Sequence, residues 1–181
     1  MKGIILSEFV EYIEQTLGVS VAQRIIDNSN LESDGAYTRV GMYDYHELIN
    51  LLTTTASETQ TEASILLDGF SNHLFAMFKR DYSVFFEGVD NAAQMLMTID
   101  NHIHIEVKKL YPDAELPKFG YTYNDNNLIL NYTSPRPLAS VAQSLVKACL
   151  KFFGDDEKLV SAIISEDQKS AQFKIQVTPK H

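Results

Sequence analysis

Several residue types that mark common protein classes are scarce or missing in this chain. It has no tryptophan and only one cysteine, Cys149, among 181 residues. A single cysteine excludes an internal disulfide and fits a reducing compartment. No apolar run is long enough to span a bilayer, and Glu8 and Glu11 interrupt the N-terminus too early for a secretory leader. We therefore expect a soluble, cytoplasmic protein.

Positive charge is also scarce. Fifteen Lys and Arg residues face 24 Asp and Glu residues, which gives a formal net charge of -9. The basic residues are scattered, so no basic stripe is available to neutralise a phosphate backbone and no basic amphipathic helix points to a membrane surface. We therefore expect neither nucleic acid nor membrane as a partner. Because 45% of the residues are hydrophobic and only 22% are charged, the chain can bury a sizeable core.

The first half of the chain has helical periodicity. Ile5, Phe9 and Ile13 recur at a spacing of four, which predicts an amphipathic helix over residues 3–17 that ends at Gly18. Apolar spacing predicts three further helices, and a longer one that begins at a cap formed by Asp90 or Asn91. The three cover about 20–28, 45–54 and 62–78, and the longer one runs to about Leu110, just before Pro112.

The second half has the character of two β-hairpins. GYTYND and NLILNYTS are β-type runs joined by the turn residues 125–127, and LVSAIIS and AQFKIQV are separated by the polar segment EDQKS. Between the hairpins, residues 137–153 predict a helix with a proline near its first turn and Gly154 just past its end. The fold class expected is α+β, with a four-stranded antiparallel sheet.

Two histidines stand close together in the longest predicted helix. His102 and His104 are two positions apart, so on an α-helix they point about 200° apart and are poor joint metal ligands. Both flank the apolar stripe that we expect to face the core. That stripe consists of Leu96, Ile99, Ile103, Val107 and Leu110.

The neighbours of each histidine favour His104 as the inward-facing one. His104 follows the row of Met97 and Tyr111, whereas His102 lies beside the charged Glu106. A lone helical histidine is usually an ordinary core or surface residue. The functional alternative is a haem ligand, because the porphyrin then supplies the other four iron donors.

The stretch NYTSPRP is a candidate receptor for carboxylates. Tyr132, Ser134 and Arg136 alternate, so in an extended chain their side chains lie on one side. Pro135 and Pro137 are expected to keep the segment extended, since each disfavours the α region for the residue before it. Two hydroxyl donors and a guanidinium suit a carboxylate. The alternative is a polar strand end that leads into a helix.

These residues together carry a family resemblance. The Tyr-x-Ser-x-Arg pattern follows His104 by 28 positions, HIEVKKLYPDAELP lies between them, and the chain begins with MKGII. In these features it resembles, over essentially its whole length, the haem nitric oxide/oxygen binding (H-NOX) domains, which are related to the haem domain of soluble guanylate cyclase. The resemblance implies one H-NOX domain with a helical N-terminal subdomain over about residues 1–60. A haem-binding part over about 61–181 would contain the sheet and the haem-bearing helices.

The same resemblance implies a role for each motif residue. The family places its iron ligand seven residues before the Tyr-Pro pair, which is His104, and the cofactor is haem b, the iron complex of protoporphyrin IX. Tyr132, Ser134 and Arg136 would hold the haem propionates, and Pro117 would press on the porphyrin and distort it.

Family members often pair the arginine of this motif with an acidic residue. Asp44 is near the right place in this sequence, although Tyr45 is the closer match by position.

Gas selectivity is expected to depend on an apolar distal pocket. Oxygen-binding relatives place a tyrosine where this chain has Val141, and bound O₂ needs such a donor because it carries partial negative charge. The resemblance therefore implies binding of NO and CO without a stable O₂ complex. The alternative for these side chains is ordinary core packing. The expected lining is Ile5, Phe9, Leu74, Phe75, Phe78, Val141 and Leu145.

The implied output is a signal rather than a reaction. NO weakens the bond trans to it, so His104 would leave the iron and its helix would move. Family members of this kind regulate a histidine kinase or a diguanylate cyclase or phosphodiesterase, and we expect a monomeric bacterial sensor.

Two other classes of protein remain as alternatives. One is a haem enzyme acting on NO or peroxide, but peroxide chemistry needs a distal acid or base. His73 is the nearest candidate, and we expect it to face away from the pocket. The other is a haem-free interaction domain, which would be colourless when purified.

Overall fold

The computed structural model describes residues 1–124, 126–154 and 158–177. Contacts between residues divide the chain into two units, Met1–Leu74 and Phe75–His181. Each unit is described by itself. The functional boundary expected near residue 60 stays a prediction.

The first unit is helical, as the periodicity predicts. At Gly18, φ is 86°, a left-handed value that glycine adopts without a steric penalty, and it lets one helix end and the next begin within a single residue. The apolar stripe of the first helix is buried, with Phe9 and Ile13 fully covered. The helices are α1 (Gly3–Leu17), α2 (Val19–Asn28), α3 (His46–Thr59) and α4 (Ala63–Asp81), the last of which continues into the second unit.

The helical segment around His104 differs from the single continuous helix that the sequence predicts. Within it the backbone N–H of His104 bonds to the carbonyl of Ile99, five residues earlier, which is the pattern of a π-helix. The elements in this part of the chain are the 3₁₀ turn η1 (Ser83–Phe86), α5 (Ala92–Thr98), the π-helical stretch η2 (Ile99–Ile103) and α6 (His104–Leu110).

The π-helical stretch alters which residues face the core. Side chains after it are rotated relative to an uninterrupted α-helix, so Leu110, expected in the core stripe, is 60% exposed. The start of α5 matches expectation more closely. Of the two candidate caps it is Asn91 that caps the helix, since its side-chain oxygen accepts the backbone N–H of Gln94 at 2.9 Å.

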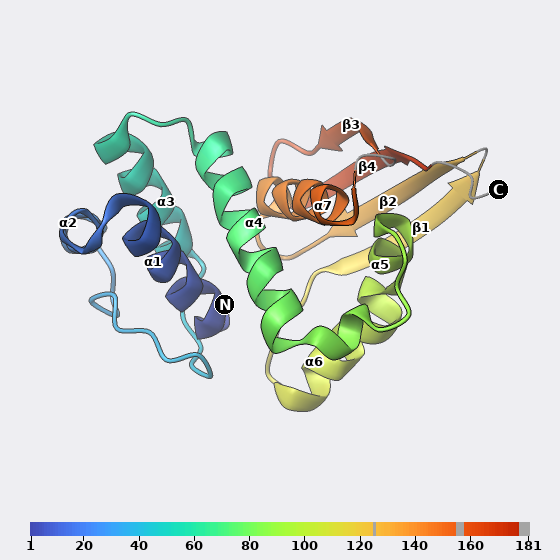
Figure 1. Ribbon diagram of the computed structural model, residues 1–181. Helices are drawn as coiled ribbons and strands as arrows, with labels where there is room; N and C mark the ends of the chain where they lie inside the picture. The colour runs from blue at the N-terminus through green and yellow to red at the C-terminus, as the bar shows by residue number, and fades with distance from the viewer. Residues whose placement is uncertain (125, 155–157, 178–181) are drawn as a thin grey trace. The chain divides into compact units, whose positions relative to one another are not determined.

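The second half of the chain forms the four-stranded antiparallel sheet that was predicted, in the order β1-β2-β4-β3. Its inner face is apolar, and α7 packs against it (Figure 1). Leu128, Leu130, Phe173 and Ile175 alternate inward and are fully buried. The elements are β1 (Lys118–Asn124), β2 (Asn127–Thr133), α7 (Ala139–Phe153), β3 (Lys158–Ile164) and β4 (Ser170–Gln176).

The turns agree with the residues that punctuate them. Gly154 ends α7 with φ 108°, and Asn126 takes a left-handed conformation with φ 61° in the first hairpin. Asp125, the residue before it, lies outside the described residues. Pro137 precedes α7 by two residues, so the helix begins slightly later than expected. Across the described ranges, no helix combines the length and apolarity needed to cross a membrane.

Candidate functional site around His104

His104 is the inward-facing histidine of the pair, as its sequence neighbours predict. It is the first residue of α6, and its side chain is 17% exposed. His102 belongs to the π-helical stretch and is exposed, with its ring edge-on to Phe85 at a centroid distance of 5.8 Å. The two histidine rings therefore occupy different environments.

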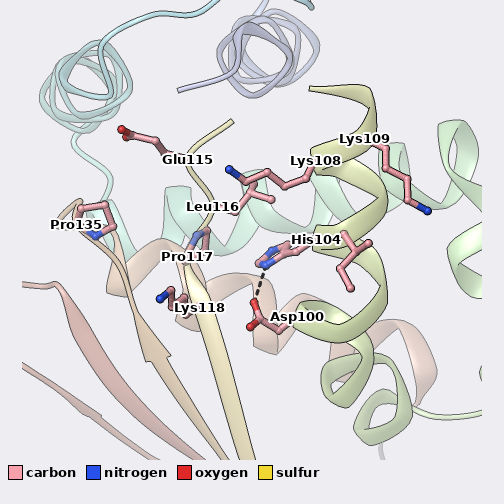
Figure 2. Close-up of a pocket in the computed structure, with 10 residues that line it drawn as sticks. Asp100, His104, Lys108, Lys109, Glu115, Leu116, Pro117, Lys118 and Pro135 are labelled. Carbon is pink, nitrogen blue, oxygen red and sulfur yellow. Dashed lines mark hydrogen bonds and ion pairs between the residues drawn. The ribbon is translucent and has the colours of Figure 1, made fainter. Parts of the chain in front are cut away.

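One ring nitrogen of His104 is held by a carboxylate. Nδ1 lies 3.0 Å from Oδ1 of Asp100 (Figure 2). Because a carboxylate only accepts, Nδ1 carries a proton, so in the neutral ring Nε2 is the nitrogen with the lone pair. Burial lowers the pKa of His104, while Asp100 and a hydrogen bond with the Pro117 backbone act in the opposite direction. A neutral imidazole whose second nitrogen keeps its lone pair is the form that binds a metal ion.

His104 and Asp100 share a pocket with the chain segment around Pro117. The cavity measures about 700 Å³, and Pro117 lies beside the His104 ring on the opposite wall (Figure 2). The walls combine apolar side chains with lysines. The lining residues are Asp100, His104, Ile105, Lys108, Lys109, Glu115, Leu116, Pro117, Lys118 and Pro135.

Neighbouring rings connect His104 to the Tyr-x-Ser-x-Arg segment. The His104 ring lies 5.8 Å from that of Phe119, which in turn lies 5.4 Å from the ring of Tyr132. Tyr132 is buried, and burial raises the pKa of its hydroxyl, so the group remains a protonated donor. The same hydroxyl is hydrogen-bonded with Ser134. The fold thus brings the predicted iron ligand and the predicted carboxylate receptor into one region of the second unit.

The receptor segment is bent rather than extended, which corrects the expectation drawn from its prolines. Strand β2 ends at Thr133, and the Ser134 hydroxyl accepts the backbone N–H of Arg136 at 3.0 Å. This local hydrogen bond closes a turn that competes with the extended conformation. Ser134 and Arg136 still act on the Tyr132 hydroxyl, because both lower its pKa against the larger effect of burial.

The acidic partner of Arg136 is Glu115, a residue that sequence reasoning missed. Arg136 Nη2 lies 2.6 Å from Glu115 Oε2, and its Nη1 donates to the Glu115 carbonyl at 3.4 Å. The Arg136 side chain is 15% exposed and that of Glu115 is 66% exposed. The sequence suggested Asp44 and Tyr45 as the positions for this acidic partner. Tyr45 has no acidic group. Asp44 accepts the backbone N–H of His46 at 2.8 Å beside the start of α3.

The expected distal residues of the second unit differ in their packing. Phe75 belongs to the core, with its ring 5.5 Å from that of Phe86. Phe78 lies three residues further along α4 and is half-buried against the same core. Val141 and Leu145 are one turn apart on α7 and are also half-buried.

The expected distal residues of the first unit are equally apolar. Ile5 is half-buried on α1, Leu74 is buried on α4, and Phe9 packs its ring edge-on against Phe70 at 4.9 Å. That all seven residues line one gas pocket stays a prediction.

Ser71 on α4 is a further buried residue that sequence reasoning missed. Its fully buried hydroxyl has no hydrogen-bond partner within the described residues.

A second polar cluster, which the spacing of its residues in the sequence does not predict, lies in the first unit. Potential ligand atoms of Glu8, Glu11 and His73 lie within 4.8 Å of one another. Both oxygens of the buried Glu8 carboxylate already have partners, since Arg39 Nη1 lies 2.7 Å from one and His73 Nε2 lies 3.0 Å from the other. These contacts make Glu8 and His73 part of an ion-pair network that ties α1, α4 and the loop before α3 together.

Asp100 and Phe119 are further residues of the His104 site that sequence reasoning missed. A signal for Asp100 was present, because residues four apart on a helix are neighbours. No comparable signal identifies Phe119, which reaches His104 from β1.

Comparisons with known proteins place these features in a family. The haem-NO-binding family model matches residues 2–160. A solved structure of the Fe(II) unliganded H-NOX protein from K. algicida is 32% identical, covers 99% of this chain and 98% of its own, and superposes with a TM-score of 0.89. The H-NOX protein from Shewanella woodyi, solved in the Fe(II)CO state with IWP-051 bound, is 30% identical over 99% of this chain and 95% of its own (TM-score 0.80).

A third solved structure supports the fold alone. The H-NOX protein from S. oneidensis in the Fe(II)NO state is 24% identical over 99% of this chain and 100% of its own, with a TM-score of 0.82. No curated protein matches the chain.

Proposed function

Because the chain belongs to the haem-NO-binding (H-NOX) family, we propose that it is a gas-sensing domain and not an enzyme, with haem b held by His104. The observation that carries this proposal is the state of the His104 ring. Its Nδ1 is bonded to Asp100, which leaves Nε2 as the nitrogen with the lone pair in the neutral ring, and the residue lines a pocket with Pro117. Imidazole nitrogen is a suitable donor to haem iron.

The residues around His104 fit the rest of the cofactor. Haem carries two propionates, and the nearby donors are the Tyr132 hydroxyl, the Ser134 hydroxyl and the Arg136 guanidinium. Arg136 already binds a carboxylate, that of Glu115, whose side chain is 66% exposed. An ion pair with so exposed a member contributes little stability, so a propionate can replace Glu115 at small cost. Pro117 supplies a rigid ring on the wall beside His104.

The haem, when bound, supplies a ferrous iron at which a diatomic gas can bind. We assign the selectivity among gases to the seven apolar residues that are named above as the expected distal lining. None of these seven side chains carries a hydrogen-bond donor, and a donor is what a stable O₂ complex requires. We therefore propose that the domain binds NO and CO in the presence of air. The S. woodyi relative, solved in the Fe(II)CO state, supports CO as one of these ligands.

The signal is proposed to begin at His104. Release of His104 from the iron on NO binding would free α6 to move together with the π-helical stretch that precedes it. Such a change acts as a switch only if the gas favours one of two arrangements over the other. The proposed receiver is a histidine kinase or a diguanylate cyclase or phosphodiesterase, acted on by a monomeric sensor.

An absorption spectrum of the purified, reduced protein tests the proposal. We expect a Soret band typical of histidine-ligated ferrous haem, unchanged by air and shifted by CO and NO, with a five-coordinate position in NO. Colourless protein that takes up no added haem would overturn the whole proposal. A stable oxy spectrum would overturn the gas selectivity alone.

The Val141→Tyr variant tests the distal assignment separately. A hydroxyl near the bound gas adds one hydrogen bond worth about 1 kcal/mol, so O₂ affinity should rise by about fivefold. Val141→Phe is the matched control, because it adds the same ring without the hydroxyl. If both variants keep their haem and neither changes the ferrous spectrum in air, Val141 does not face the gas.

A further inference from the structure

We propose that Asp100 is a positioning residue for the iron ligand: its carboxylate holds His104 by Nδ1 and strengthens the bond that His104 makes through Nε2. The proposal rests on the proposed haem-binding function and adds a residue that controls how readily His104 is released.

The contact between the two side chains is direct. Asp100 Oδ1 lies 3.0 Å from His104 Nδ1, at the distance of a normal hydrogen bond, and the Asp100 and His104 side chains are 38% and 17% exposed, respectively. A charged acceptor makes a stronger hydrogen bond than a neutral carbonyl does. The imidazole is therefore held in one tautomer and one orientation before any ligand arrives.

The local backbone favours this contact. Asp100 belongs to the π-helical stretch and His104 follows it directly, with its backbone N–H bonded to Ile99 rather than to Asp100. A single π turn inside a helix changes the direction of the side chains that follow, and such turns are frequent at functional sites. In this chain Asp100 and His104 both line the pocket that also contains Pro117 (Figure 2).

The chemical consequence follows from the direction of the hydrogen bond. A carboxylate that accepts the Nδ1 proton draws it away from the ring, which increases the electron density at Nε2 and makes it a better donor to a metal ion. Loss of that support should weaken the bond between His104 and the iron. Asp100 thus opposes release of His104 and sets the threshold that NO must overcome.

The test measures the strength of that bond in holoprotein. Resonance Raman spectra of the ferrous protein should show the iron–histidine stretch at lower frequency in Asp100→Ala than in wild type, with Asp100→Asn between them. Stopped-flow mixing with NO should show His104 release accelerated by about tenfold in Asp100→Ala, a typical effect of removing such a partner of a metal ligand.

Glu106→Gln is the matched control, because it removes a carboxylate from the same helical segment at a position whose partner is Lys109, at 2.6 Å, and not His104. Its stretch and release rate should equal those of wild type. If the Asp100 variants bind haem and match Glu106→Gln in both measurements, the positioning role is overturned.

Wild-type spectra separate the two proposals. If wild type shows no histidine-ligated haem, the proposed function fails and the role of Asp100 falls with it. If wild type shows that spectrum and the variants do not differ from it, only the role of Asp100 fails. Asp100→Asn keeps the shape of the side chain, so the test remains decisive if Asp100→Ala does not fold.

Discussion

Each of the two units contains a carboxylate bonded to a histidine at the same distance. In the first unit Glu8 lies 3.0 Å from His73, and in the second Asp100 lies 3.0 Å from His104. Both histidines are mostly buried, with 16% and 17% of their side chains exposed. The two pairs share this distance and degree of histidine burial, although His73 is bonded through Nε2 and His104 through Nδ1, and the two units differ in what surrounds them.

The surroundings decide which pair can bind a ligand. Glu8 is 1% exposed and its second oxygen is bonded to Arg39, so its charge is balanced by protein groups on both sides. His104 instead lines a pocket, and the carboxylate that holds it is partly exposed. A carboxylate–imidazole pair becomes a candidate binding site when one nitrogen keeps its lone pair beside a cavity.

The largest expected effect comes from breaking the second pair at its histidine. His104→Gly should abolish the histidine-ligated ferrous spectrum and reduce haem retention, and free imidazole should restore both. His73→Ala should leave the spectrum unchanged, since its partner is the buried Glu8. Absorption spectra of both variants with and without imidazole make the comparison. Equal loss of haem in the two variants would contradict the distinction between the pairs.

The imidazole-rescued variant also tests the signal. A free imidazole is not attached to α6, so its departure cannot move the helix. If His104→Gly with imidazole regulated its partner identically with and without NO, release of the ligand would not be the trigger.

A smaller effect is expected from removing the charge of the first pair. Glu8→Gln loses charge-assisted hydrogen bonds to Arg39 and His73, and the free energy of unfolding should fall by about 2 kcal/mol. The loss is moderate because the Arg39 side chain is 46% exposed and can be hydrated. Urea denaturation measures it, with the exposed Glu14→Gln on the same helix as control. Equal stability of the two variants would show that the buried network contributes nothing.

The smallest expected effect has the opposite sign. Ser71 is fully buried and its hydroxyl lacks a partner among the described residues, which costs about 1 kcal/mol or more. Ser71→Ala should therefore raise the free energy of unfolding by about 1 kcal/mol, as measured by urea denaturation. Ser29→Ala is the control, because the similarly buried Ser29 hydroxyl donates to the Ile25 carbonyl at 2.6 Å and its loss should destabilise. A destabilised Ser71→Ala variant would mean that the hydroxyl has a partner in solution.

The elements whose signals are local could be predicted from the sequence. Periodicity of Ile5, Phe9 and Ile13 defined the first helix, Gly18 ended it, and alternation of β-type residues defined both hairpins. Each signal depends on neighbours within a few residues, so no knowledge of distant contacts was needed. The inward orientation of His104 could likewise be predicted, because its helical neighbours differ in polarity from those of His102.

The groups that contact the motif residues could not be predicted from the sequence, because they depend on long-range packing. Glu115 reaches Arg136 across 21 positions of sequence, and Phe119 reaches His104 from a strand, so neither contact follows from a helical or strand period. The π-helical stretch is a further case, since backbone propensities do not specify one extra residue in a turn. The bend at Ser134 shows the same limit. Prolines predicted an extended chain, and a hydroxyl that accepts a backbone N–H decided otherwise.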